Sequence, residues 1–158
     1  MSALINFLKQ ADIFYQLAPD QLEQVATLCE ERTYRMGEII LEEGACSKEL
    51  YVITQGEVEI LVNPAVVGGP ESPKGMVTIA VLRRGQSFGE IALVDEGVRS
   101  ATVRAAQKGT RIISLAREKI MELCEDHPEL GYRLMYNLAA DLAMKIRNTD
   151  MRIRETLL

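Results

Sequence analysis

The residue types with the clearest chemical potential lie in one short segment, FGEIALVDEGVRSATVRA, which begins at Phe88. Glycine at position 89 permits a backbone conformation or a close approach that a side chain would block. If Glu90 then begins a short helical turn, the backbone amides of Ile91 and Ala92 are left unpaired. Free amides at the start of a helical turn favour negative charge. This order of residues therefore predicts an anion site.

Arg99 follows after an acidic loop and can return to the same place. Its planar guanidinium matches a phosphate through two parallel hydrogen bonds, and the Ser100 hydroxyl adds another donor. Ala92 is small enough for a ligand to lie close to the backbone. Glu90 would be out of place beside an anion unless the ligand also offers a hydroxyl proton, which a carboxylate accepts. A phosphate with one adjacent hydroxyl describes a ribose 3′,5′-cyclic phosphate, in which only the 2′-hydroxyl stays free. The alternative is that Glu90 and Arg99 form a surface ion pair, a contact worth about 0–1 kcal/mol.

The composition is that of an ordinary globular chain: 158 residues, 47% hydrophobic and 26% charged. A formal net charge of −5 argues against nonspecific nucleic-acid binding. The N-terminal residues MSALINFLKQADIF lack a basic region and are interrupted by charges, so they predict neither a secretory signal nor a membrane span. Three widely spaced cysteines, Cys29, Cys46 and Cys124, fit buried thiols in a reducing compartment, and we expect a cytoplasmic protein.

The elements that must position the segment follow the order helix, roll, helix. We expect a single domain over residues 1–158, with helices in 1–31, a β-roll in 32–115 and C-terminal helices in 116–156. Within the roll, short β-rich runs are separated by glycines, and a turn is expected near Lys108-Gly109. The run EVEILV alternates, which predicts a half-buried strand with Val58, Ile60 and Val62 on one face.

Two segments have alternative interpretations, one in the roll and one in the C-terminal region. The Pro/Gly-rich run NPAVVGGPESPKG (63–75) predicts a hairpin excursion, either a tolerated insertion or a partner contact. Asp126 and Glu129 form the pattern of a capping box for a long last helix. Along that helix a stripe recurs at spacings of three and four residues: Leu134, Leu138, Leu142, Ile146, Thr149 and Ile153. Such a stripe is either part of the core or the interface of a symmetric homodimer. We expect the homodimer, because the helix is too long to pack wholly on a small roll.

The segment from Phe88 strongly resembles the phosphate-binding cassette of cyclic-nucleotide-binding domains, as in bacterial catabolite activator proteins and cAMP-dependent kinase regulatory subunits. The run RMGEIILEEGACSKELYVITQGEVEIL is similar to the first strands of that family, including turns at Gly44 and Gly56. The resemblance covers nearly the whole chain. It implies an α+β fold: an antiparallel double-stranded β-helix, or jelly-roll-like β-roll, flanked by N-terminal helices and a long C-terminal helix.

The resemblance also implies a role for each cassette residue. Glu90 would bind the 2′-hydroxyl and Arg99 the cyclic phosphate. Backbone and lining contacts would come from Gly89, Ile91, Ala92, Ser100 and Ala101. In dimeric bacterial regulators a threonine in an RxT segment of the last helix touches adenine, and IRNTDMRI places Thr149 at the matching position.

The expected function is a cyclic-nucleotide sensor that signals through its last helix to an unidentified partner. The ligand is cAMP or cGMP: a hydroxyl residue after the cassette arginine reads guanine in some relatives, whereas Thr149 favours cAMP. One alternative is a truncated DNA-binding regulator of the catabolite-activator type; another is a degenerate cassette that serves only for dimerisation. With one histidine and no nucleophile-base pair in the sequence, we expect no enzyme, cofactor or metal site.

Overall fold

The structure, a computed structural model, describes residues 1–65, 75–95 and 97–158. Most of the Pro/Gly-rich excursion predicted for 63–75 lies outside the described residues. Helix α1 (Ser2–Leu8) and the 3₁₀ turn η1 (Asp12–Phe14) come first, followed by α2 (Pro19–Ala26). Pro19 occupies the first turn of α2, as its fixed φ angle favours. The chain leaves the helical region earlier than predicted, because β1 already begins at Glu30.

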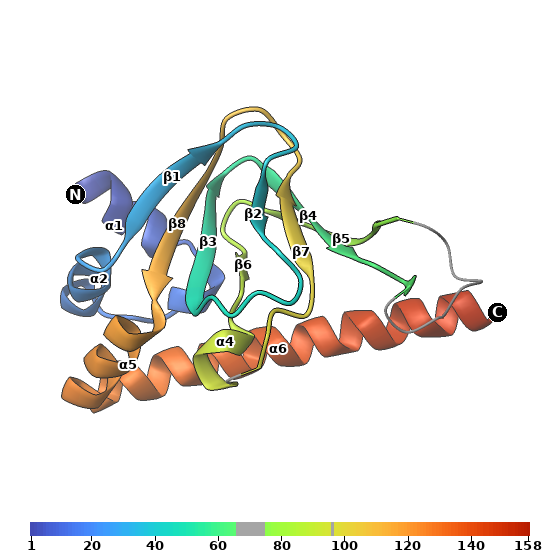
Figure 1. The fold of residues 1–158 in the computed structure, drawn as a ribbon. Coiled ribbons are helices and arrows are strands. Elements are labelled where there is room, and N and C mark those ends of the chain that lie inside the picture. Colours follow the sequence, from blue (N-terminus) through green and yellow to red (C-terminus); the bar gives the residue numbers. More distant parts are fainter. Residues whose placement is uncertain (66–74, 96) are drawn as a thin grey trace.

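In the part of the chain that the structure describes, the roll consists of two four-stranded antiparallel sheets (Figure 1). The first sheet has the order β1 (Glu30–Tyr34), β8 (Thr110–Ala116), β3 (Glu49–Gln55) and β6 (Ser87–Phe88). The second has the order β2 (Ile39–Leu41), β7 (Thr102–Ala105), β4 (Glu57–Val62) and β5 (Val77–Arg83). Neighbouring strands are largely non-consecutive in sequence, which is the connectivity of a jelly-roll and confirms the predicted fold class. The turn predicted near Lys108-Gly109 joins β7 to β8.

The alternation predicted for β4 is interrupted. Val58 is fully buried as expected, but Leu61 is also buried whereas Ile60 and Val62 are only half-buried. The cause is a shift of register against β5 between Ile60 and Leu61. A bulge of this kind moves the following side chains to the other face of the strand.

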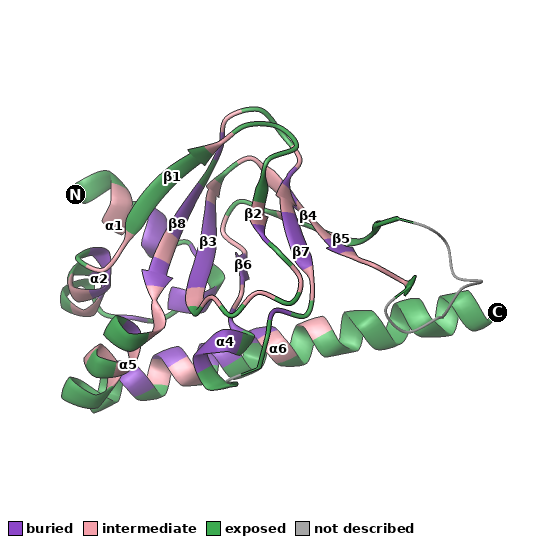
Figure 2. Ribbon diagram, in the orientation of Figure 1, coloured by how far each residue is buried: buried purple, intermediate pink, exposed green. Residues whose placement is uncertain are grey.

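Within the described residues, two hydrophobic clusters stabilise the fold. The smaller lies between the two sheets and includes Val58, Phe88 and Val103. The larger joins the first sheet to α1, η1, α2 and the C-terminal helices, with Phe14, Leu22 and Ile113 among its fully buried members. Buried positions accordingly gather on the inner strands and on the first half of the last helix (Figure 2).

The C-terminal region contains α5 (Arg117–Asp126) and α6 (Pro128–Leu157), while the four-residue helix α4 (Ile91–Val94) belongs to the cassette. The predicted capping box is wrong: Asp126 ends α5, and the residue that caps α6 is His127, without a side-chain hydrogen bond. At 30 residues, α6 is roughly 45 Å long and extends well past the roll (Figure 1).

The predicted apolar stripe of α6 does not form one face. Leu134 and Leu138 are buried in the larger cluster and Leu142 is half-buried, but Ile146 and Ile153 are 61% and 53% exposed. A regular α-helix of 3.6 residues per turn drifts against a repeat of four, so residues spaced mostly by four wind around the helix. Among the described residues, no helix combines the length and apolar character needed to cross a bilayer.

Candidate functional site

The cassette lies between β6 and β7, with α4 at its centre. Gly89 directly follows β6 with φ at +75°, a left-handed conformation that favours glycine. A Cβ atom at this position would lie 2.9 Å from both the Arg99 guanidinium and the carbonyl oxygen of Glu49, and 3.2 Å from the Tyr51 ring. The glycine is therefore required both by its backbone angle and by the close approach of Arg99.

Arg99 is 6% exposed and is held by three hydrogen bonds. Its Nη1 donates to Gly89 O (2.9 Å), its Nη2 to Glu49 O (2.8 Å) and its Nε to Ser47 Oγ (3.2 Å). Burial lowers the pKa of this guanidinium, whereas nearby acidic groups and an ionisable hydroxyl raise this pKa. An arginine fixed by neutral carbonyls and a hydroxyl keeps its positive charge available to an anion.

An aromatic platform supports the arginine. Arg99 Cζ lies 5.9 Å from the centroid of the Tyr51 ring, which stacks on Phe88 at 5.0 Å. The Tyr51 hydroxyl donates to Glu49 Oε2 at 2.5 Å. Burial and then this bond to Glu49 raise the pKa of the Tyr51 hydroxyl, so the ring stays neutral beneath the guanidinium.

Glu90 is 5% exposed and forms an ion pair that the sequence did not reveal. Lys145 of α6 donates from Nζ to Glu90 Oε1 (2.6 Å) and to Ser87 O (2.7 Å). The same Nζ lies 2.9 Å from Asp141 Oδ2. The lysine therefore supplies a positive charge to a buried carboxylate and connects the cassette to α6.

The predicted helical turn does form, with Glu90 at the position that precedes α4. One part of the prediction is wrong, however, because the Ala92 amide donates to Gly89 O at 3.3 Å and is not free. Within the residues that the structure describes, the Ile91 amide has no such backbone partner. The turn therefore leaves fewer free amides than the sequence predicted.

A cavity of about 450 Å³ lies between the cassette, the inner side of β5 and the middle of α6. The structure brings all eight predicted residues to its wall: Gly89, Glu90, Ile91, Ala92, Arg99, Ser100, Ala101 and Thr149. The sequence prediction missed its apolar side, formed by Ile79 and Val81, and the α6 residues Lys145, Asn148 and Arg152. The sequence does contain a signal for Lys145, because it ends a row of polar residues on α6 at intervals of four: Asn137, Asp141 and Lys145.

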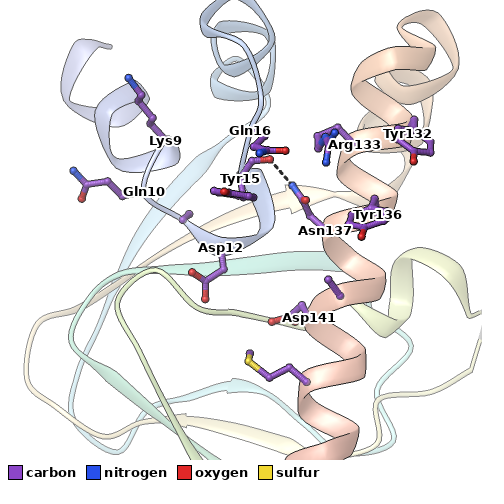
Figure 3. Close-up of a pocket in the computed structure, with 13 residues that line it drawn as sticks. Lys9, Gln10, Asp12, Tyr15, Gln16, Tyr132, Arg133, Tyr136, Asn137 and Asp141 are labelled. Atoms are coloured by element: carbon purple, nitrogen blue, oxygen red, sulfur yellow. Dashed lines mark hydrogen bonds between the residues drawn. The ribbon is translucent and has the colours of Figure 1, made fainter.

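A second hollow, larger at about 810 Å³, is lined by the segment 9–16 around η1 and by α6 residues between Tyr132 and Met144 (Figure 3). None of the cassette residues that the structure describes contributes to its wall. It contains Tyr132, Tyr136 and Arg133 at its rim and Asp12 and Asp141 at its lower end. The chemistry needed for an anion with a neighbouring hydroxyl is therefore found in the smaller cavity, where Arg99 and Glu90 both lie.

Comparison with known proteins agrees with this geometry. The family model described as the cyclic nucleotide-binding domain matches residues 31–127, which include the cassette and all of the roll except Glu30. The chain therefore belongs to the cyclic nucleotide-binding domain family.

Two curated relatives illustrate the range of the family. The Cyclic AMP receptor protein of Thermus thermophilus is 32% identical over 146 residues, which is 92% of this chain and 62% of that protein. The cGMP-dependent protein kinase egl-4 of Caenorhabditis briggsae is 32% identical over 125 residues, which is 79% of this chain and 16% of that protein. This chain thus spans less than two thirds of each of these relatives.

A solved cyclic nucleotide-binding domain from Methylobacillus flagellatus has the same fold. It superposes with a TM-score of 0.83 at 22% sequence identity, over 99% of this chain and 84% of that chain. The long helix after the roll is included in that coverage, so the placement of α6 belongs to the shared architecture.

Proposed function

We propose that the chain is a cyclic-nucleotide sensor in which Arg99 binds the cyclic phosphate, Glu90 binds the 2′-hydroxyl, and α6 transmits the bound state. The observation that carries the proposal is the placement of Arg99 and Glu90, both over nine-tenths buried, on the wall of one cavity. Opposite charges at such a site suit a ligand that presents an anion and a hydroxyl side by side.

The phosphate half of the site rests on the way Arg99 is held. Among the residues that the structure describes, its three hydrogen-bond acceptors are two carbonyls and a hydroxyl, and none of these carries a charge. Desolvation disfavours the bare cation, and a bound phosphate restores the lost electrostatic stabilisation. Ser100 and Ala101 lie beside Arg99 on the cavity wall and complete the phosphate contacts that we propose.

The hydroxyl half rests on the free capacity of Glu90. Lys145 bonds its Oε1, and a carboxylate accepts several hydrogen bonds, so Oε2 is the acceptor that we assign to the 2′-hydroxyl. Lys145 also limits the repulsion between this carboxylate and an incoming phosphate.

We assign the base to the α6 side of the cavity and favour adenine. The Thr149 hydroxyl donates its proton to Lys145 O at 2.9 Å, which leaves its oxygen able only to accept a further hydrogen bond. Adenine presents an amino donor at the ring position where guanine presents a carbonyl acceptor. A hydroxyl that can only accept therefore prefers adenine, in line with cAMP as the ligand.

For the output we propose a second copy of this chain on the outer face of α6. The stripe predicted from sequence splits, but a different row of exposed residues alternates in spacing by four and three. Its members are Tyr132, Tyr136, Ala139, Ala143, Ile146, Asp150, Ile153 and Leu157. That spacing is the seam of a parallel two-stranded coiled coil. Because Lys145 and Thr149 reach the cavity from the same helix, the state of the cavity and the position of the seam are coupled.

The test begins with protein freed of bound nucleotide by unfolding and refolding, with refolding verified by circular dichroism. Calorimetric titration with cAMP and with cGMP should give micromolar or tighter binding, with cAMP the stronger. Stronger binding of cGMP would overturn the assignment of Thr149 to adenine. No heat with either nucleotide, in refolded protein, would mean a cassette without ligand and would overturn the proposal.

A further inference from the structure

The inner face of α6 carries a row of three polar residues, Asn137, Asp141 and Lys145, where an apolar helix face would be expected. Asn137 is 7% exposed, and its Nδ2 donates to Ile13 O (3.0 Å) and Tyr15 O (2.7 Å). These bonds attach η1 to α6, and the one to Tyr15 is drawn in Figure 3. The amide thus fixes the rotation of the helix one turn before Asp141.

Asp141 is 8% exposed and forms an ion pair with Lys145. Its Oδ2 lies 2.9 Å from Lys145 Nζ, at an angle that does not form a hydrogen bond. Within the described part of the chain, Oδ2 has no hydrogen-bond partner. A buried carboxylate needs a counter-charge, so Asp141 strongly favours an ammonium at this position.

That ammonium is the one that bonds Glu90. Lys145 Nζ reaches Glu90 Oε1 at 2.6 Å and Ser87 O at 2.7 Å, and its side chain is 28% exposed. A lysine has a flexible stem and three donors, so its position is set by the acceptors around it. Asp141, on the same helix, holds the lysine on one side while the cassette holds it on the other.

A second carboxylate lies next to this pair. Asp12 of η1 lies close to Asp141 at the lower end of the larger hollow (Figure 3). Partial burial raises the pKa of Asp12, the charge of Asp141 raises it further, and Lys145 lowers it. Asp12, Asp141 and Lys145 therefore act on one another, and Asp141 is the member that lies between η1 and the ligand cavity.

We propose that Asp141 is a positioning residue that sets the preference of the site for ligands with a 2′-hydroxyl, by holding Lys145 on Oε1 of Glu90 only. The inference rests on the proposed role of Glu90 as the acceptor of that hydroxyl. Without the charge of Asp141, Lys145 either turns fully to Glu90 and covers both oxygens, or leaves the cassette. In the first case the acceptor is blocked, and in the second a buried carboxylate loses its counter-ion and is driven to turn toward solvent. Both outcomes weaken recognition of the hydroxyl.

The experiment compares the dissociation constants of cAMP and 2′-deoxy-cAMP. Wild type should prefer cAMP by roughly 10- to 100-fold, the range of a hydrogen bond to a charged acceptor. Asp141→Asn should lower this preference by roughly threefold to thirtyfold, mostly through weaker cAMP binding. Glu155→Gln, which removes an exposed charge from the same helix, should leave the preference unchanged.

A double-mutant cycle tests whether Asp141 acts through Lys145. Lys145→Gln should also lower the preference, and adding Asp141→Asn to it should change the preference no further. If Asp141→Asn alone does not fold, the comparison of Lys145→Gln with the double variant still tests the inference, because the double variant removes both charges together.

Three results would overturn the inference. If Asp141→Asn loses equal affinity for cAMP and for 2′-deoxy-cAMP, the role of Asp141 is purely structural. If the effects of the two substitutions on the preference add up in the double variant, Asp141 acts without Lys145. In both cases the proposed function stands. If wild type binds neither nucleotide, the proposed function fails and this inference with it.

Discussion

Gly89 and Arg99 are in direct contact: the Gly89 carbonyl accepts a hydrogen bond from Arg99 Nη1 at 2.9 Å, and a Cβ on Gly89 would lie 2.9 Å from that same nitrogen. We expect Gly89→Ala to displace the guanidinium and to weaken binding of the cyclic nucleotide. The left-handed backbone adds strain of about 1–3 kcal/mol, which lowers the free energy of unfolding. Chemical denaturation and titration of the same sample measure the two effects.

Gly37→Ala is the matched control. Gly37 has φ at +84°, but nothing lies within 4 Å of the position of its Cβ. This variant should lose a similar amount of stability and keep its affinity. If Gly89→Ala binds as tightly as Gly37→Ala, the close approach at Gly89 has no role in the site.

Tyr51 should influence affinity through its ring. Tyr51→Leu removes the aromatic face 5.9 Å from Arg99 Cζ, a cation–π contact worth about 0.5–2 kcal/mol, and should weaken binding roughly 2- to 30-fold. Tyr51→Phe keeps the ring, loses only the bond to Glu49 Oε2, and should bind nearly as well as wild type. Equal losses in the two variants, measured by calorimetry, would assign the effect to the hydroxyl instead.

The outer face of α6 should determine the oligomeric state. Ile146 lies on the proposed seam and is 61% exposed, so Ile146→Glu should shift a dimer to monomer in sedimentation velocity, because it removes an apolar contact and adds a second pair of facing charges next to Asp150. Met151 is similarly exposed (58%) but lies one residue off the seam, so Met151→Glu should stay dimeric. A wild-type chain that sediments as a monomer at all concentrations would contradict the proposed seam.

The three thiols should differ in reactivity. Cys46 is exposed, and Cys29 and Cys124 are half-buried, which corrects the expectation that all three cysteines are buried. Burial raises the pKa of the Cys29 thiol to about 12, and burial together with Glu125 raises that of Cys124. Because the thiolate is the reactive form, a disulfide reagent at pH 8 should modify one thiol rapidly in the native protein and three after unfolding. Two or more rapid thiols in the native protein would contradict the burial of Cys29 and Cys124.

The cassette could be predicted from sequence because its chemistry is local. Gly89, Glu90 and Arg99 lie in one short segment of the sequence. Their residue types indicate the backbone angle, the carboxylate and the guanidinium, respectively. The fold class was equally accessible, since glycine-separated β-rich runs between helices allow few architectures.

The contribution of α6 could not be derived in the same way. Which face of α6 meets the roll is decided by tertiary packing, in part by the bonds from Asn137 to the backbone of η1. The apolar residues alone suggested a different stripe, and Lys145 therefore went unnoticed although it lies one turn before Thr149. The bulge at Ile60 and Leu61 was missed for a related reason, because the register of β4 depends on its partner β5.

The most direct test of the account is the affinity of cAMP for Arg99→Ala, measured beside wild type and Arg104→Ala. Arg104 forms a partly exposed ion pair with Glu59 away from the cavity, so its loss should leave cAMP binding unchanged. Arg99→Ala should lose about 2–5 kcal/mol of binding free energy, because it leaves a phosphate charge in a buried site without its partner. An Arg99→Ala protein that is folded and binds cAMP as tightly as wild type would contradict the central claim.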